Sequence, residues 1–420
     1  MEQIIGEKTT RTKCKGGGLD MSKKEVLKMI IVWIKNSLML IALPIFFTFV
    51  FGKVYSNTFV EEIPMVVLDM DNSSMSRMIT KQFKESPGFQ IKNYAKSEDE
   101  LKELITRKEA YAGLIIPKDF EKNVKEMNAP KTLFVVDQTN IVIGNNAFAY
   151  GSEILNTLNA GVQLNVLQAK GMKPYEAKKA VTSMSFVQRV LYDPQISYMK
   201  YLMFGIIGIM IQQTFLEVLA PSLIEDKKKI SNIKLRSLDS LKYLIRILGR
   251  ILIVTALAFV GFSISFYAAC KYFHLPLRGI ILYDYVLLLV FILDLIAVSF
   301  VFAAIFKEVL PCVQICMFLS VPAILMCGYV WPEYMMPEGL PNIIKMIWPL
   351  GYFINPLRDI NLKGSGFQVI LPYLQGGLHY AAVWLPIGIG LYALRIAIDK
   401  WLQNRKLNKE QEAKIAEANA

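Results

Sequence analysis

The sequence of 420 residues lacks the motifs that carry common enzyme chemistry. It contains no Gly-x-x-x-x-Gly-Lys-[Ser/Thr] loop, whose backbone N–H groups cradle nucleotide phosphates. It also contains no His-Glu-x-x-His metal motif, no Gly-x-Ser-x-Gly nucleophile motif and no cluster of metal ligands. We therefore expect no catalytic, cofactor-binding or metal-binding residue in this chain.

Cysteine is scarce, and no cleavable leader is evident. The five cysteines are an odd number, and none lies between residues 53 and 197, which argues against a disulfide framework. Cys312 and Cys316 share a helical face but have no His or carboxylate beside them, so apolar packing is their favoured role. The first apolar run has no small-residue cleavage site behind it, and we expect it to remain as a membrane anchor.

Long apolar segments dominate what is present. Hydrophobic residues make up 54% of the chain and the mean hydropathy is +0.37, which excludes an ordinary soluble enzyme. A membrane helix needs about 20 apolar residues. We predict an α-helical membrane protein with six transmembrane helices, within residues 38–54, 201–223, 248–270, 283–306, 309–330 and 378–397.

The positive charge is unevenly distributed along the chain. The net charge is +12, and residues 1–36 carry eight Lys and Arg against four acidic residues. Residues 225–250 carry eight against three, whereas residues 53–197 are nearly balanced. Cationic flanks mark the cytoplasmic side of a membrane. We therefore predict a multi-pass protein of the cell membrane with both termini cytoplasmic and residues 55–197 outside, and we expect no nucleic-acid partner.

The N-terminal region divides into a polar and an amphipathic part. Residues 1–21 are predicted to be a disordered cytoplasmic tail. From residue 22, apolar side chains recur at helical spacing opposite lysines, which is typical of a helix lying in the membrane interface. Residues 22–54 are thus predicted to form an interfacial elbow helix and the first transmembrane helix. The alternative is one tilted span over residues 26–51.

The segment 55–197 alternates strand-like and helix-like patterns, which predicts an inserted α/β domain. Strands are expected at residues 63–68, 89–94, 111–116 and 131–136. Helices are expected at 74–85, at 98–107 with a Ser97 capping box, at 118–128 opened by Pro117, and from about 145 to 169, with one more starting at Pro174.

The stretch Asp69-Met70-Asp71-Asn72-Ser73 resembles both a phosphatase nucleophile loop and the start of a calcium loop. The calcium pattern requires glycine and glutamate where Ser74 and Thr80 stand. The phosphatase pattern requires a supporting lysine that the sequence does not place. A structural role therefore remains, in which Asn72 or Ser73 caps the following helix.

Residues 315–360 contain five prolines after an apolar segment has ended, together with Pro322 inside it. Broken backbone at membrane depth survives only where protein or a water-filled cavity shields it. We therefore predict a fifth membrane helix followed by an outer re-entrant segment over residues 331–377. The features in order are Pro322, Cys327-Gly328, Pro332, Pro337, Pro349-Leu350 and Arg358.

This ordered set resembles the signature of ABC-2 type (type V exporter-like) permeases, with Cys327 where a serine is expected. The resemblance implies a membrane subunit with a large extracytoplasmic domain between its first two transmembrane helices. A five-helix region over residues 198–401 and a cytoplasmic tail over 402–420 complete it. It further implies an ATP-driven exporter, as in multidrug efflux, whose separate ATPase subunits bind ATP and Mg²⁺. A homodimer, or a heterodimer with a similar permease, would line the pathway.

The loop 225–247 lies where the resembled family couples to its ATPase. Apolar residues alternate there with cationic ones, and Lys229–Ser231 replace the family's glycine-threonine. The resemblance implies a docking helix with the coupling residues Glu225, Ile230, Ile233, Leu235, Arg236 and Leu238. The alternative is a basic loop held against anionic lipid.

Glu217 and Asp294 lie inside predicted spans, where an ionisable group is expensive and normally faces a bundle interior or water. We take them as pathway or gate candidates, although Glu217 could instead pair with Lys307. The other pathway or gate candidates are Pro322, Gly328, Pro332 and Arg358.

Two other functions remain open at this point. A membrane receptor or scaffold presenting its outer domain would explain that domain but not the proline-broken segment. An ion-driven carrier is disfavoured because no internal inverted repeat is visible. Drug, lipid, peptide and ion substrates are not distinguished.

Overall fold

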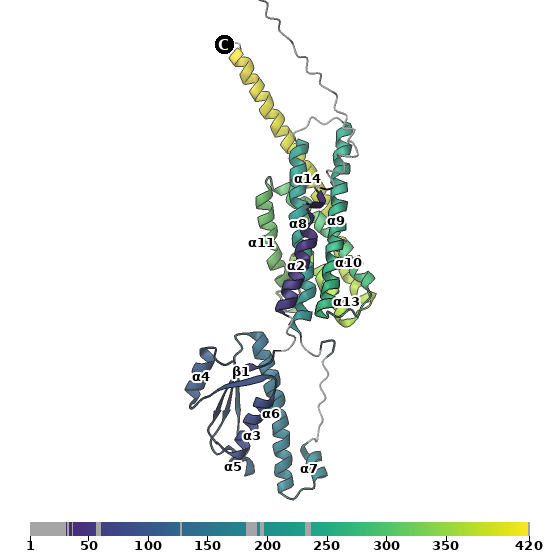
Figure 1. Cartoon of the computed structure of the whole chain (residues 1–420). Coiled ribbons are helices and arrows are strands. Elements are labelled where there is room, and N and C mark those ends of the chain that lie inside the picture. The colour runs from purple at the N-terminus through teal and green to yellow at the C-terminus, as the bar shows by residue number, and fades with distance from the viewer. Residues whose placement is uncertain are drawn as a thin grey trace, which may run out of the picture. The chain divides into compact units, whose positions relative to one another are not determined.

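A computed structural model shows the chain as two compact units, Met1–Ser56 with Tyr198–Ala420, and Asn57–Ser197 (Figure 1). Each unit has its own hydrophobic core. The structure describes residues 31, 33–35, 37–55, 60–126, 128–181, 191–193, 197–231 and 237–418. The predicted tail 1–21 and the elbow residues 22–30 lie outside the described residues.

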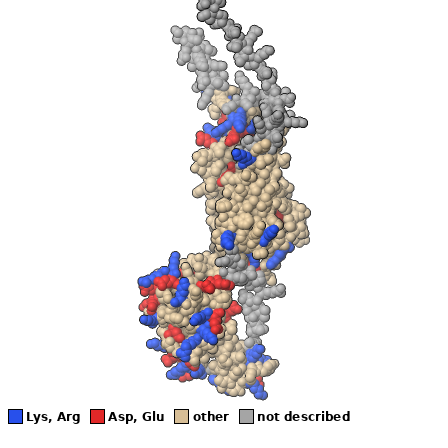
Figure 2. All heavy atoms as spheres, viewed as in Figure 1, with Lys and Arg blue, Asp and Glu red and all other residues tan. Residues whose placement is uncertain are grey.

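Six helices of the first unit are long and apolar enough to cross a membrane, as the sequence predicts. Two of them, the second and the fourth, are mostly buried among the others, and the rest present apolar side chains outward. On the face shown in Figure 2, charged residues of this unit gather toward its two ends. The helices are α2 (Met39–Val54), α8 (Tyr198–Ser231), α9 (Ser237–Phe273), α10 (Ile281–Ile305), α11 (Val309–Met326) and α14 (Phe367–Ala418).

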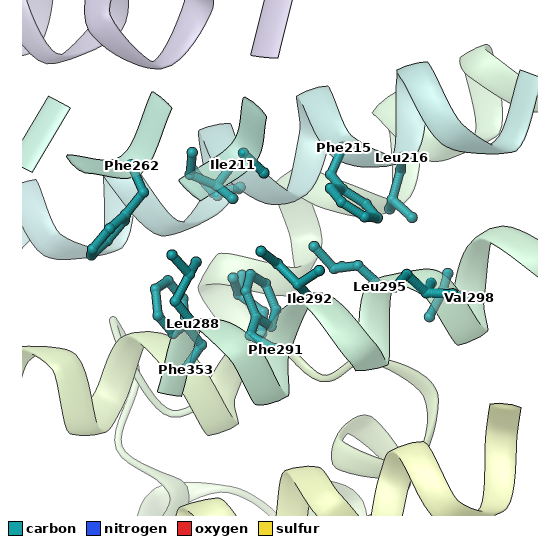
Figure 3. Packing of buried hydrophobic residues seen from close by; sticks show 14 of the residues in the cluster. Ile211, Phe215, Leu216, Phe262, Leu288, Phe291, Ile292, Leu295, Val298 and Phe353 are labelled. Atoms are coloured by element: carbon teal, nitrogen blue, oxygen red, sulfur yellow. The ribbon is translucent and has the colours of Figure 1, made fainter. Parts of the chain in front are cut away.

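The core of this unit lies between α8 and α10. Ile211 and Phe215 of α8 face Ile292 and Leu295 of α10 (Figure 3). Phe291 stacks on Phe353 with 4.7 Å between ring centroids. α10 is apolar almost all round and most of its span is buried, which is typical of a helix inside a bundle, although Val286 and Leu289 are exposed.

The helices extend further than the apolar runs indicate. α14 begins at Phe367, so residues 367–377 belong to this helix and not to a re-entrant segment. It also continues through most of the expected tail, to Ala418. At the other loop, α8 runs to Ser231 and α9 begins at Ser237, so most of the predicted loop 225–247 is helical. Hydropathy marks the part of a helix in hydrocarbon, whereas backbone hydrogen bonding continues into polar residues.

Short helices follow α11, in agreement with the broken pattern there. They are the 3₁₀ helix η1 (Glu333–Met335), α12 (Leu340–Ile347) and α13 (Leu350–Lys363).

The second unit contains a four-stranded sheet in the order β2-β1-β3-β4. β1 is parallel to β2 and β3, and β4 is antiparallel to β3. α3, α5 and α6 share one buried cluster with the sheet, and α4 shares another. The elements are β1 (Ile63–Asp69), α3 (Ser74–Glu85), β2 (Phe89–Tyr94), α4 (Glu98–Thr106), β3 (Ala112–Ile116), α5 (Phe120–Lys125), β4 (Leu133–Val136), α6 (Ile141–Ala169) and α7 (Pro174–Val181).

Local caps in this unit form as the sequence predicts. Ser73 accepts a hydrogen bond from the backbone N–H of Ser76 at 3.0 Å, and Ser97 accepts one from Glu100 at 3.2 Å. These bonds satisfy N–H groups that the first helical turn leaves free.

The start of α5 differs from the prediction. Pro117 was expected to open a helix at Lys118, but α5 begins at Phe120. The Asp71 carboxylate accepts hydrogen bonds from the N–H groups of Phe120 (2.9 Å) and Glu121 (3.1 Å). The Asp-x-Asp stretch therefore has a structural role in this unit, because it caps a helix that is distant in sequence.

Candidate functional site

Two tyrosines and an arginine pack together just after the C-terminus of α11. Gly328 follows the helix with φ +82°, and a Cβ built there would lie 2.7 Å from Cγ of Glu333. Glycine adopts this left-handed conformation without the strain that a Cβ introduces. The reversal returns the chain toward α8, so that Tyr329 is only 2% exposed.

Tyr329 and Tyr201 hold each other through reciprocal hydrogen bonds. The Tyr201 hydroxyl donates to the carbonyl oxygen of Tyr329 at 2.7 Å, and the Tyr329 hydroxyl donates to the carbonyl oxygen of Tyr201. The Gly205 N–H also donates to the Tyr329 hydroxyl at 3.0 Å. Both rings stack with centroids 5.7 Å apart. The start of α8 is thus fixed to the chain after α11.

Arg358 of α13 completes this cluster of Tyr201, Tyr329, Gly328 and Arg358, which we call the outer cluster after the side of the membrane that the sequence predicts for it. The guanidinium lies 4.4 Å from the Tyr329 ring centroid and 5.3 Å from that of Tyr201. Its Nη1 donates to the Tyr329 carbonyl oxygen at 3.1 Å. Planar guanidinium groups stack on aromatic faces in this way. Arg358 of α13 therefore contacts both the start of α8 and the chain that follows α11.

The other predicted gate residues lie apart from this cluster. Pro332 precedes η1, and its carbonyl accepts the N–H of Met335 at 3.1 Å. Pro322 is half-buried inside α11. Glu217 is half-buried on α8 and accepts a hydrogen bond from the Gln213 side chain.

In the part of the chain that the structure describes, Glu217 and Asp294 also lack the ion-pair partners that would neutralise them. Among the described residues, Glu217 forms no ion pair with Lys307. Asp294 is completely buried within α10, and neither of its carboxylate oxygens has a hydrogen-bond partner among the described residues.

At the other end of the unit, buried charged residues of α8 bind its neighbours. Asp226 is 0% exposed, and its carboxylate lies 3.0 Å from Nη1 of Arg250 and 3.7 Å from Nε of Arg246, both on α9. Arg250 also donates to the Ser222 carbonyl oxygen at 2.9 Å, and its guanidinium stacks 4.7 Å from the Trp33 ring. Removing one partner of a buried ion pair leaves an unpaired charge and costs about 3–5 kcal/mol.

Lys227, the next residue, caps another helix. Its Nζ donates to the carbonyl oxygens of Ala303 (2.5 Å) and Phe306 (2.7 Å) at the C-terminus of α10. The last carbonyls of a helix lack partners within it and favour a cation. Tyr392 of α14 donates to the Leu223 carbonyl oxygen at 2.8 Å. We call Asp226, Lys227, Arg246, Arg250 and Tyr392 the helix-end network, which joins α8 to α9, α10 and α14.

The predicted coupling residues adjoin this network. Glu225 is exposed near the end of α8. Ile230 was expected on an exposed docking face, but it is only 7% exposed and packs in the core of the membrane unit. Leu238 belongs to α9, a different helix from Ile230, so the two do not share one short helix. Ile233, Leu235 and Arg236 lie outside the described residues.

The sequence did not lead us to most of the residues that form the outer cluster and the helix-end network. Tyr201 and Tyr329 resemble ordinary aromatic residues at span ends. Asp226 and Lys227 lie in the predicted coupling loop but were not singled out there, although they are 0% and 1% exposed. A usable signal was present, because an arginine among apolar residues, such as Arg250, needs polar or aromatic partners wherever it is buried.

These features define a multi-pass helical membrane protein with an inserted α/β unit. Its helix bundle is held together by side-chain contacts at both ends, in the outer cluster and in the helix-end network. The chain belongs to the family described as ABC-2 family transporter protein, which it matches over residues 35–390. It is therefore the permease subunit of an ABC exporter, which works with an ABC ATPase and is not an enzyme by itself. The receptor alternative is set aside by this match.

Curated relatives agree with the family. The chain is 20% identical over 309 residues to "Probable multidrug ABC transporter permease YbhR" of Escherichia coli strain K12, covering 73% of this chain and 79% of that protein. The protein of the same name from Escherichia coli O157:H7 gives the same values. No solved structure gives a significant match.

Proposed function

We propose that the chain exports drug-like organic compounds and that its ATPase binds at the junction between α8 and α9. The similarity to a permease named as a multidrug transporter supports this substrate class. ATP and Mg²⁺ would be bound by the ATPase. Two copies of this chain, or one copy and a similar permease, would line the pathway.

The proposed orientation places the α8–α9 junction and both termini in the cytoplasm. The unit Asn57–Ser197 is then extracytoplasmic. The basic flanks of residues 1–36 and 225–250 support this orientation.

The observation that carries the proposal is the helix-end network beside the junction. A partner that pushes on the end of α8 also moves α9 through Asp226 and α10 through Lys227, because both contacts are short and buried. Packed helices that move as a block convert a local push into a rigid-body change. At the far end, the outer cluster would act as a gate, and Pro332 remains a gate candidate apart from it. Glu217, Asp294 and Pro322 remain pathway candidates.

Co-purification with the ATPase tests the docking site. Changing Ile233 and Leu235 together to Asp should remove ATPase binding, because a buried interface anchor typically contributes about 2 kcal/mol or more. Tyr175→Asp, at a 78% exposed residue of the other unit, is the control and should retain binding. A double variant that keeps both its ATPase and its export rate would move the docking site elsewhere.

Labelling with an impermeant thiol reagent tests the orientation. In a background without the native cysteines, Lys96→Cys should react from outside intact cells and Lys234→Cys should not. The reverse pattern would overturn the proposed topology.

A further inference from the structure

Asp294 lies near the middle of α10, and no group of the described residues pairs with its carboxylate to balance a negative charge. Its side chain is 0% exposed, and both carboxylate oxygens lack a hydrogen-bond donor among the described residues. No ion pair of the described residues includes it. By contrast Asp284, in the same helix, accepts a hydrogen bond from the Asn361 side chain at 3.0 Å.

The residues packed around Asp294 are neutral. Gly377 of α14 and Tyr352 of α13 lie beside Asp294. Tyr380 of α14 also lies within electrostatic range of it, and its hydroxyl is already engaged with the Ile347 carbonyl oxygen at 3.0 Å. The side of α10 that faces α8 is apolar, as Figure 3 shows for Ile292 and Leu295. An ionised carboxylate without a partner is therefore strongly disfavoured at this position.

The space beside the carboxylate is also small. A Cβ built on Gly377 would lie 3.3 Å from Oδ2 of Asp294 and 2.7 Å from Cγ1 of Val290. A Cβ on Gly376 would lie 2.3 Å from the ring of Tyr352. The two glycines thus bring the backbone of α14 against α10 and α13. A hydrated metal ion or a substrate amine would require these helices to separate, whereas a proton would not.

We propose that Asp294 is a proton-binding site whose occupancy is linked to the packing of α10 against α14. A proton from water forms an O–H bond at one carboxylate oxygen, which gives a neutral side chain in the packed state. When α14 moves away and water enters, that bond breaks and the proton returns to water. Raising the pH therefore favours separation of the two helices. This inference goes beyond the proposed function, and its test requires neither the ATPase nor a substrate.

Infrared spectroscopy of the full chain in lipid nanodiscs at neutral pH tests the site directly. A protonated carboxyl has a C=O stretch that an ionised carboxylate lacks. We expect this band in the wild type, with a shift when isotope-labelled aspartate is incorporated. Asp294→Asn should remove the Asp294 contribution. The control Asp359→Asn should retain it, because Asp359 pairs with Lys363 at 2.8 Å. No loss of aspartate band in Asp294→Asn would overturn the proposal.

If the Asp294→Asn protein does not fold in sufficient amounts, Asp294→Glu serves as a second variant. In Asp294→Glu, the C=O band of the protonated carboxyl should shift with labelled glutamate in place of labelled aspartate.

Thermal unfolding across pH gives an independent readout. Because the folded state binds a proton that the unfolded state releases, wild-type stability should fall relative to Asp294→Asn as the pH rises, by up to about tenfold in the folding equilibrium per pH unit. A constant difference between the two proteins would contradict proton binding.

Discussion

The ammonium group of Lys227 on α8 lies 2.7 Å from the carbonyl oxygen of Phe306, directly after the last turn of α10. One side chain thus closes the C-terminus of a neighbouring transmembrane helix, next to the junction at which we place the ATPase. In the proposed mechanism, this contact transmits a displacement of α8 to α10.

Lys227→Met should reduce export without preventing the ATPase from binding. The substitution removes the Lys227 donor from two carbonyl oxygens, one buried and one partly buried, at a cost of about 1–3 kcal/mol for the buried one. ATPase co-purification should persist, because Lys227 is 1% exposed and is not a surface for docking. Export per ATP hydrolysed should fall. Lys229→Met, at an exposed neighbour, is the control and should change stability by no more than about 0.5 kcal/mol. Equal behaviour of the two variants would contradict this role.

Arg358→Lys should loosen the outer cluster. An ammonium group cannot stack as a planar guanidinium does, and it loses the fixed geometry of the bond to the Tyr329 carbonyl oxygen. We expect a loss of about 1 kcal/mol in stability and a changed export rate. Arg278→Lys is the matched control, because Arg278 donates to the Leu362 carbonyl oxygen at 2.7 Å and stacks on no ring of the described residues. Export that is unaffected in both variants would exclude a gating role for the cluster.

Gly328→Ala should destabilise the turn after α11. A residue with a Cβ at φ +82° is strained by about 1–2 kcal/mol, and the Cβ also meets Glu333 at 2.7 Å. Gly339 has the same φ but no atom within 4 Å of its built Cβ, so Gly339→Ala isolates the backbone strain. Thermal unfolding in nanodiscs should therefore show a larger loss for Gly328→Ala. A smaller loss than at Gly339 would show that the contact with Glu333 relaxes freely.

The second unit should lose a helix cap in acid. The Ser73 side chain, followed by the backbone N–H groups of Glu121 and Phe120, lowers the pKa of Asp71 below its ordinary value. This contribution to stability is therefore present above the ordinary pKa and is lost as the pH falls through the folded-state pKa. Asp71→Asn should destabilise the unit at neutral pH but not in strong acid. Hydrogen exchange of α5 measures this, with Glu109→Gln as the exposed control.

Much of the fold could be predicted because it depends on neighbouring residues. Apolar runs identify six spans, and the Ser73 and Ser97 caps act on groups three residues away. The Asp71 cap on α5 joins residues 49 apart, and the Lys227 cap on α10 joins residues 79 apart. No local pattern contains such pairs, so the start of α5 and the function of Lys227 required the structure.

Some residues of the candidate sites could likewise be predicted from a local pattern, and others could not. Gly328 and Arg358 follow from an ordered motif, whereas Tyr201 joins them only through folding. Ile230 was placed on an exposed face because its neighbours are cationic, but α8 continues through it and buries it. An amphipathic pattern predicts which face is apolar, and it does not show whether a partner or the same chain covers that face.

Reconstitution with and without the ATPase tests the central claim most directly. The purified chain in proteoliposomes should hydrolyse no ATP above background, since it has no phosphate-binding loop. With the ATPase and ATP, inside-out vesicles should accumulate ethidium as a drug-like probe, and the variant with Ile233 and Leu235 changed to Asp should not. ATP hydrolysis that purifies with this chain alone, or uptake that needs no ATPase, would contradict the account.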